Sequence, residues 1–237
     1  MLRLRIELPD QPGSLGRVTW TLGVLGADVA QIFVLERNGG RALDDITLEW
    51  RGQPRERLLS ALRSIPGVQP VGVWAARATP EAMPEAGVMA AMVIDPNRAL
   101  ATLMNAAPLV LAASWACVSD DTGTVRMSSP EAPARPRLPD AVPARIVAVT
   151  DGARLARAPL PDGLVLTVGR EDGPSFHRSE LGRLRYMLDV LASLPVGAVR
   201  EPRRPDDDRS QCGKRSQPAT RPRPGSPRSS PPPPPRP

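Results

Sequence analysis

The first eight residues alternate between apolar and charged side chains. Leucine or isoleucine occupies every even position from 2 to 8, while Arg3, Arg5 and Glu7 fill odd positions between them. A period of two is that of a β-strand, whose successive side chains point to opposite faces of a sheet. The pattern predicts a strand over residues 2–8 with one face buried and the other charged.

Five further elements are predicted before residue 76. Pro9 to Gly13 interrupt the chain, and a helix capped by Ser14 follows as far as Gly26. The order strand, helix, strand, strand, helix, strand is that of the ferredoxin-like βαββαβ fold, an antiparallel sheet with two helices on one face. The later elements are a strand over 28–37, a turn at 38–40, a strand around 46–50, a helix from Pro54 and a strand over 68–75.

The remainder of the folded part predicts a second, smaller α+β domain. We expect an N-terminal domain over residues 1–76, a linker over 77–86 and the second domain over 87–195. No repeat relates the two. The expected elements of the second domain are a short strand at 87–94, a helix at 97–111, a hairpin of 114–119 with 124–128, a proline-rich loop at 129–143, strands at 145–149 and 163–170, and an amphipathic helix at 179–194.

The basic character of the chain is concentrated at its C-terminal end. The net charge is +6, and residues 201–237 hold 9 basic and 4 acidic residues, so +5 of it lies there. The same stretch has 12 of the 30 prolines, and only Cys212 and Ala219 belong to the hydrophobic set. Such a composition cannot offset the entropy of ordering, so residues 196–237 are predicted to be a disordered tail. A solvated extension is favoured over a docking tail or a nucleic-acid-binding tail.

The sequence offers little for enzyme chemistry. His177 is the only histidine, and it stands where an N-cap would pair with Glu180 in a capping box. Asp44 and Asp45 are neighbours in a predicted strand and point to opposite faces, so they cannot share a metal. Cys117 and Cys212 form no metal motif or disulfide framework. We expect a cytoplasmic protein that is not an enzyme, needs no cofactor or metal, and has no membrane segment.

The loop before the first helix is the most informative site. Asp10 lies just before a helix N-terminus, whose free N–H groups and dipole favour a carboxylate. An aspartate for an ammonium group and N–H groups from Gly13 to Leu15 for a carboxylate together describe a free α-amino acid. The alternative is a tight turn in which Asp10 and Pro12 have no ligand and Ser14 only caps the helix.

The same residues resemble the ACT family over residues 2–75. Asp10-Gln11-Pro12-Gly13-Ser14-Leu15, followed by Val18, Leu22 and Gly26-Ala27-Asp28-Val29, is similar to the D-x-P-G-x-L … L … G-x-N-I pattern of that family. ACT domains have the ferredoxin-like fold, commonly pair side by side, and bind amino acids at the pair interface. The resemblance implies a ligand site formed by Asp10, Pro12, Gly13, Ser14, Leu15, Asp28, Val29 and Gln31. Asp28 replaces an asparagine that many amino-acid-binding members carry.

Residues 87–194 resemble a small GAF-like domain in the order of their elements and in Gly173-Pro174-Ser175-Phe176 before the last helix. An apolar ligand pocket there would use Trp115, Cys117, Val125, Leu166 and Phe176, although plain core packing is favoured for all five.

The expected function is a non-enzymatic sensor or regulator that binds an amino acid, or a similar small effector, at a homodimer interface. Its output would pass through the second domain or an unidentified protein partner. The alternative is a dimerisation or adaptor module that needs no ligand.

Overall fold

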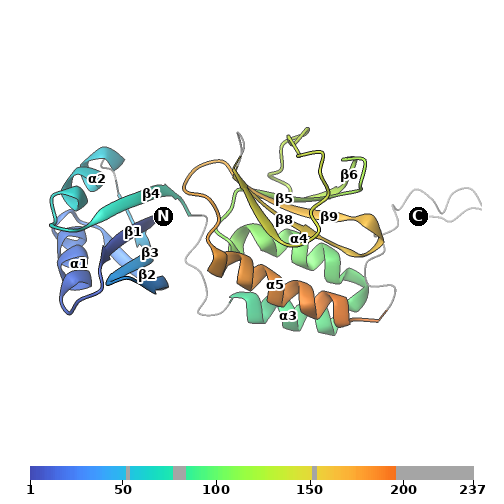
Figure 1. Cartoon of the computed structure of the whole chain (residues 1–237), viewed down its shortest axis with the longest axis horizontal. Coiled ribbons are helices and arrows are strands. Elements are labelled where there is room, and N and C mark those ends of the chain that lie inside the picture. Colours follow the sequence, from blue (N-terminus) through green and yellow to red (C-terminus); the bar gives the residue numbers. More distant parts are fainter. Residues whose placement is uncertain (52–53, 77–83, 151–153, 196–237) are drawn as a thin grey trace, which may run out of the picture. The chain divides into compact units, whose positions relative to one another are not determined.

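The N-terminal half has the ferredoxin-like arrangement that the sequence predicts. The computed structural model describes residues 1–51, 54–76, 84–150 and 154–195 (Figure 1). The sheet has the strand order β2-β3-β1-β4, and every pairing in it is antiparallel. Its elements are β1 (Leu2–Pro9), α1 (Ser14–Val24), β2 (Asp28–Asn38), β3 (Arg41–Glu49), α2 (Arg55–Arg63) and β4 (Gln69–Ala75).

One face of this sheet is an apolar core under two helices. The even-numbered side chains of β1 pack with Ile46 and Leu48 of β3. Val18 and Leu22 of α1 close this layer, together with leucines of α2. The predicted strand and helix periodicities therefore meet in a single core.

The other face of the sheet differs from the simple expectation of a charged, solvated surface. Arg3 and Arg5 are each only 2% exposed, and Asp45 on the neighbouring strand is 1% exposed. Residues of the second half cover them, as the hydrogen bonds described below show. The central strands β1 and β3 are thus buried on both faces, one apolar and one ionic.

The second half is also α+β, with a five-stranded antiparallel sheet in the order β6-β5-β9-β8-β7. Figure 1 shows α3, α4 and α5 on one side of this sheet. The elements are α3 (Pro84–Ile94), the short 3₁₀ helix η1 (Pro96–Arg98), α4 (Ala99–Val110), β5 (Trp115–Ser119), β6 (Val125–Ser128), β7 (Val147–Thr150), β8 (Arg154–Pro159), η2 (Pro161–Gly163), β9 (Val165–Arg170) and α5 (Arg178–Ser193).

Two elements of this half correct the sequence prediction. Residues 87–94, expected as a short strand, belong to helix α3, which already begins at Pro84 inside the predicted linker. Strand β8 was not predicted, because Arg154 and Arg157 interrupt its apolar residues. The remainder of the predicted linker, 77–83, lies outside the described residues, as does the predicted tail from 196 onward.

The two sheets belong to one compact unit of the chain, Met1–Glu201. Each has its own apolar core, and the larger core lies between the five-stranded sheet and its helices. Within the described part of the chain, no helix is both long and apolar enough to cross a membrane.

Candidate functional site

The loop between β1 and α1 is a tight turn held by its own backbone. The Gln11 N–H donates to the Pro9 carbonyl at 2.9 Å, and the Ser14 N–H donates to the Gln11 carbonyl at 3.1 Å. The Asp10 N–H donates to the Gly40 carbonyl at 2.9 Å, which ties the loop to the β2–β3 hairpin. The loop is therefore a fixed feature of the sheet end.

Helix α1 begins differently from the sequence prediction. The N-cap is Gly13, with φ of 84°, and Ser14 is the first helical residue. No side chain caps the helix, and no acidic residue lies in its first turn. Ser14 is buried, and its hydroxyl lies 3.5 Å from Arg17 Nη2. The expected Ser14 cap is thus wrong, and the start of α1 lacks the side-chain acceptor that most helices have.

Two carboxylates and one guanidinium lie near this helix end. Arg37 Nε is 3.7 Å from Asp10 Oδ1, in an ion pair that is largely open to solvent. Asp44, on β3, is 2% exposed, and its Oδ1 has no hydrogen-bond partner. Burial raises the pKa of Asp44; Arg37 lowers it, and nearby Asp10 and Asp45 raise it further. A buried carboxylate oxygen without a hydrogen bond, in the field of Asp10, lowers stability, and an ammonium group would relieve that cost.

The remaining predicted ligand residues lie at the other end of β2. Asp28 and Val29 begin this strand, whereas the loop at Asp10 contacts the hairpin that ends it. An 11-residue strand at about 3.3 Å per residue spans roughly 30 Å. One copy of the chain therefore does not bring Asp28 and Asp10 together. Gln31 lies in the same part of β2, and its Oε1 is buried without a hydrogen-bond partner.

Of the predicted residues, the loop set is thus brought together and the β2 set is not. Pro12 and Gly13 are exposed at the turn, and Leu15 is half-buried against the apolar core. Asp44 is the residue near the site that sequence reasoning set aside, because it was considered only as a metal ligand.

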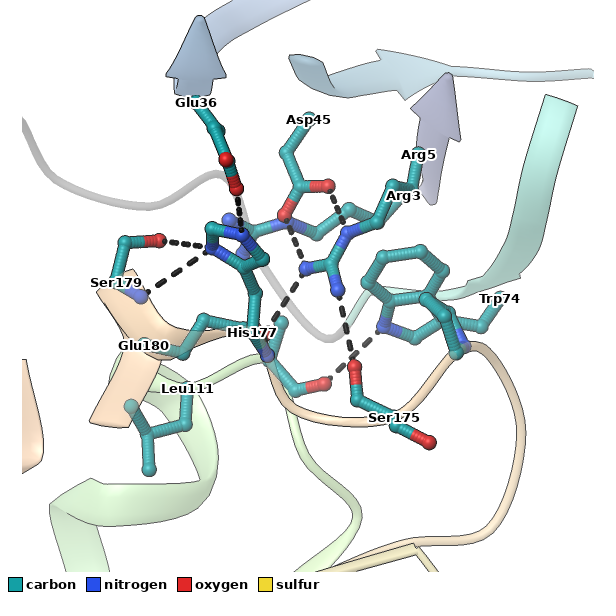
Figure 2. A network of polar contacts seen from close by, with 12 residues as sticks. Arg3, Arg5, Glu36, Asp45, Trp74, Leu111, Ser175, His177, Ser179 and Glu180 are labelled. Carbon is teal, nitrogen blue, oxygen red and sulfur yellow. Dashed lines mark hydrogen bonds and ion pairs between the residues drawn. The ribbon is translucent and has the colours of Figure 1, made fainter. Parts of the chain in front are cut away.

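The junction of the two halves holds a buried ionic network (Figure 2). Arg5 donates two hydrogen bonds to Asp45, from Nε to Oδ1 at 2.7 Å and from Nη2 to Oδ2 at 2.9 Å. Its Nη2 also donates to Glu180 Oε2 at 3.0 Å, which links β1 to α5. We call Arg3, Arg5, Asp45, Arg170 and Glu180 the junction network.

Glu180 is the centre of the junction network. It accepts from Arg5 on one oxygen and from Arg170 Nη2 on the other, the latter at 2.6 Å. The His177 N–H donates to it at 2.8 Å. Burial, the largest influence, raises the pKa of this carboxyl, but Arg170 and Arg5 together with the His177 bond hold it below its usual value. Glu180 is therefore ionised and fully paired.

Arg170 fixes the end of α4 to the same network. It donates to the carbonyls of Leu111 and Ala112 at 2.6 and 3.1 Å, and Ala112 also accepts from Trp74 Nε1 at 3.1 Å. The Trp74 ring lies 5.1 Å from the Arg170 guanidinium and 5.5 Å from that of Arg5. Trp74 comes from β4, so a side chain of the first sheet is packed within the second half.

The junction network carries one more cation than anion. Arg3 Nε is 3.3 Å from Asp45 Oδ2, and its Nε and Nη2 are buried without a hydrogen bond. Burial lowers the pKa of Arg3, while Asp45 and Glu180 raise it. The alternation of residues 2–8 correctly predicts that Arg3 and Arg5 share one face, but it does not indicate which residues cover that face.

His177 plays the structural part that the sequence predicts. It is the N-cap of α5 and forms a capping box with Glu180. Its Nε2 lies 2.9 Å from Glu36 Oε2, and Arg178 Nη2 lies 2.8 Å from Glu36 Oε1. Glu36 belongs to β2, so the strand next to the loop is also tied to the start of α5.

The five residues of the predicted apolar pocket in the second half do not form one pocket: Val125 is exposed, and the other four are divided between two cores. Trp115 and Cys117 lie on one face of the five-stranded sheet, and Leu166 and Phe176 lie on the other. Burial raises the pKa of Cys117 to about 11, so its thiol stays protonated and unreactive. Among the described residues, no group of three or more histidine, cysteine, aspartate or glutamate side chains is placed to hold a metal ion.

Comparisons with known proteins add no family. No protein-family model matches the sequence, and no curated protein matches it. A crystal structure described as an unknown protein from Galdieria sulphuraria aligns with 80% of this chain and 89% of its own, at 13% identity and a TM-score of 0.28. The fold assignment therefore rests on strand order and connectivity.

Proposed function

We propose that this chain is an ACT-type, non-enzymatic regulator that binds a free amino acid between two copies of itself. The observation that carries the proposal is the division of the ligand residues between the two ends of β2. Asp10 and the start of α1 lie at one end, and Asp28, Val29 and Gln31 lie at the other.

A twofold pair brings the two ends together. Strand β2 is an edge strand of its sheet, so its outer backbone groups are available to a second strand. Antiparallel pairing of two β2 strands centred near Phe33 places Asp28 of the second copy opposite Asn38, beside the loop. Such a contact is isologous, so it creates two equivalent sites.

Each end of an amino acid has a partner in this arrangement. The Ser14 N–H already donates to Gln11, but no side chain caps the start of α1, and its other N–H groups suit the carboxylate. Asp10 and Asp44, whose Oδ1 has no hydrogen-bond partner, suit the ammonium group. Asp28, in place of asparagine, adds its charge on the ammonium side when it comes from the second copy.

Exposed apolar side chains on the same half support pairing. Trp20 and Val24 on α1 are 72% and 66% exposed, and Val34 on β2 is 47% exposed. Burying them against a second copy removes apolar area from water. The same observation supports the alternative function, a pairing module that needs no ligand.

The contacts of Glu36 give a route for output. Binding at β2 acts on the strand that holds His177 and Arg178 through Glu36. A ligand shifts such a contact only by its different affinity for the two states, typically by about 1–3 kcal/mol.

The test is a thermal-shift screen of the twenty common amino acids against the wild type, Asp10→Ala and a control, Asp121→Ala, at another exposed aspartate. An amino acid at a hundred times its dissociation constant stabilises the fold by about 2.7 kcal/mol. We expect one amino acid, or a related group, to raise the melting temperature of the wild type and of the control but not of Asp10→Ala. A screen in which no amino acid shifts the wild type contradicts the proposal.

Sedimentation with and without amino acids distinguishes the proposed sensor from a pairing module that needs no ligand. A dimer that Trp20→Ser dissociates and that no amino acid affects supports the ligand-independent pairing module.

A further inference from the structure

A groove runs along α5 in the second half, away from the loop at Asp10. Its volume is about 550 Å³, within the range of sites for small organic ligands. The helix forms one wall from Arg178 to Ala192, and Arg145–Ile146 and Pro159–Pro161 form the other.

The lining of the groove is aliphatic below and cationic at the rim. Leu160 and Leu191 are buried at its base, and Ile146, Leu181 and Leu188 are half-buried beside them. The charged residues of the lining are three arginines and a single carboxylate, Asp189. The local charge therefore favours an anion with an apolar body.

Two of the three arginines already have partners. Arg178 binds Glu36 at 2.8 Å, and Arg185 Nε lies 3.7 Å from Asp189 Oδ2. Arg145 is exposed and has no ion pair with any described residue. A single free guanidinium matches a head group with one negative charge, such as a carboxylate.

We propose that this groove binds a monocarboxylate with a medium-length aliphatic chain. The chain lies against the leucines, and the carboxylate lies at Arg145. The composition of residues 201–237, with a net +5 and only two hydrophobic residues, matches neither the cationic rim nor the aliphatic base. This site is independent of the amino-acid site proposed above.

Gly182 allows the groove to be filled without disturbing the fold. It lies on α5 and lines the groove, and a Cβ built on it meets no atom within 4 Å. Gly182→Leu therefore places its side chain in the groove and also improves helix propensity. Gly87 on α3 has the same open surroundings and does not line the groove, so Gly87→Leu is the matched control.

The experiment is calorimetric titration of the full chain with decanoate, decanol and decylammonium. We expect saturable binding of decanoate, weaker binding of decanol and none of decylammonium. Gly182→Leu abolishes decanoate binding, and Gly87→Leu leaves it unchanged. Arg145→Glu weakens it at least about tenfold, whereas Arg135→Glu, with the same charge change on an exposed loop, alters it less than about twofold.

Four results would overturn the proposal, three of them from the titrations. Those three are the absence of saturable decanoate binding, equal binding of decylammonium, and decanoate binding to a folded Gly182→Leu variant as tight as to Gly87→Leu. Cosedimentation with phosphatidylglycerol vesicles in place of decanoate binding would instead assign the rim to a membrane surface and overturn the small-molecule site. If Gly182→Leu does not fold, the comparison of Arg145→Glu with Arg135→Glu decides, and equal decanoate binding by the two variants would contradict the proposal.

Discussion

At the scale of single residues, the most informative side chains are charged and buried. Glu180 is 0% exposed and receives bonds from both halves of the compact unit. Asp44 is 2% exposed, and one of its carboxylate oxygens receives none. A paired buried charge holds a structure together, whereas an unpaired one destabilises it until something binds.

Removing Glu180 leaves Arg5 and Arg170 buried without their shared anion. We expect Glu180→Ala to lower the free energy of unfolding by about 3–5 kcal/mol. Glu171→Ala, at an exposed acid of the same half, should change it by less than about 0.5 kcal/mol. Urea denaturation of both variants measures this, and equal effects would refute the role given to Glu180.

Removing the charge of Asp44 should instead raise the free energy of unfolding at neutral pH. Its folded-state pKa is raised above the unfolded value of about 3.9, so its contribution to stability is full below that pH and is lost as pH rises through the folded pKa. Asp44→Asn should therefore match the wild type near pH 3 and exceed it by about 1 kcal/mol at pH 7. Urea unfolding at both pH values measures this, with Asp121→Asn as the control. A loss of stability at pH 7 would contradict the assignment.

At the scale of elements, local pattern predicted most of the first half. Alternation of apolar and charged residues predicts β1, the glycines at 39 and 40 predict the β2–β3 hairpin, and the spacing of leucines predicts the two helices. Pattern failed in α3, because its apolar run from Val88 to Ile94 has no clear period and fits a buried strand equally well. It failed again at β8, whose Arg157 is buried within a strand. Local periodicity cannot predict that a residue is buried by segments distant in the sequence.

The start of α1 depends on Gly13. Its φ of 84° is strained for any residue with a Cβ, although a Cβ there would meet no atom within 4 Å. We expect Gly13→Ala to destabilise the protein by about 1–2 kcal/mol through backbone strain alone. Gly16→Ala, inside the same helix with equally open surroundings, should stabilise it by about 0.5–1 kcal/mol. Thermal unfolding of the pair decides it, and the same sign for both would count against a left-handed cap.

At the scale of the whole molecule, the proposed amino-acid site requires two chains, because its candidate residues lie at opposite ends of β2. The sequence predicts Asp10 and Asp28 as candidate ligand residues, but their separation at the two ends of β2 appears only in the structure. The junction network lies on the opposite face of the sheet from the apolar core. Separately, Glu36 of β2 binds His177 and Arg178, so a change at β2 has a physical connection to the start of α5. The buried Arg5 face of β1 could not be predicted, because residues 175 and 180 complete it from far along the chain.

Complementation between two inactive variants tests the shared site most directly. Asp10→Ala and Asp28→Ala should each abolish binding of the amino acid that gives the largest shift in the screen. Mixed in equal amounts and allowed to exchange subunits, they form heterodimers with one intact site, so calorimetry should recover about a quarter of the wild-type sites. Recovery of none from a mixture that has exchanged, or full binding by Asp28→Ala alone, would contradict a site built from two copies.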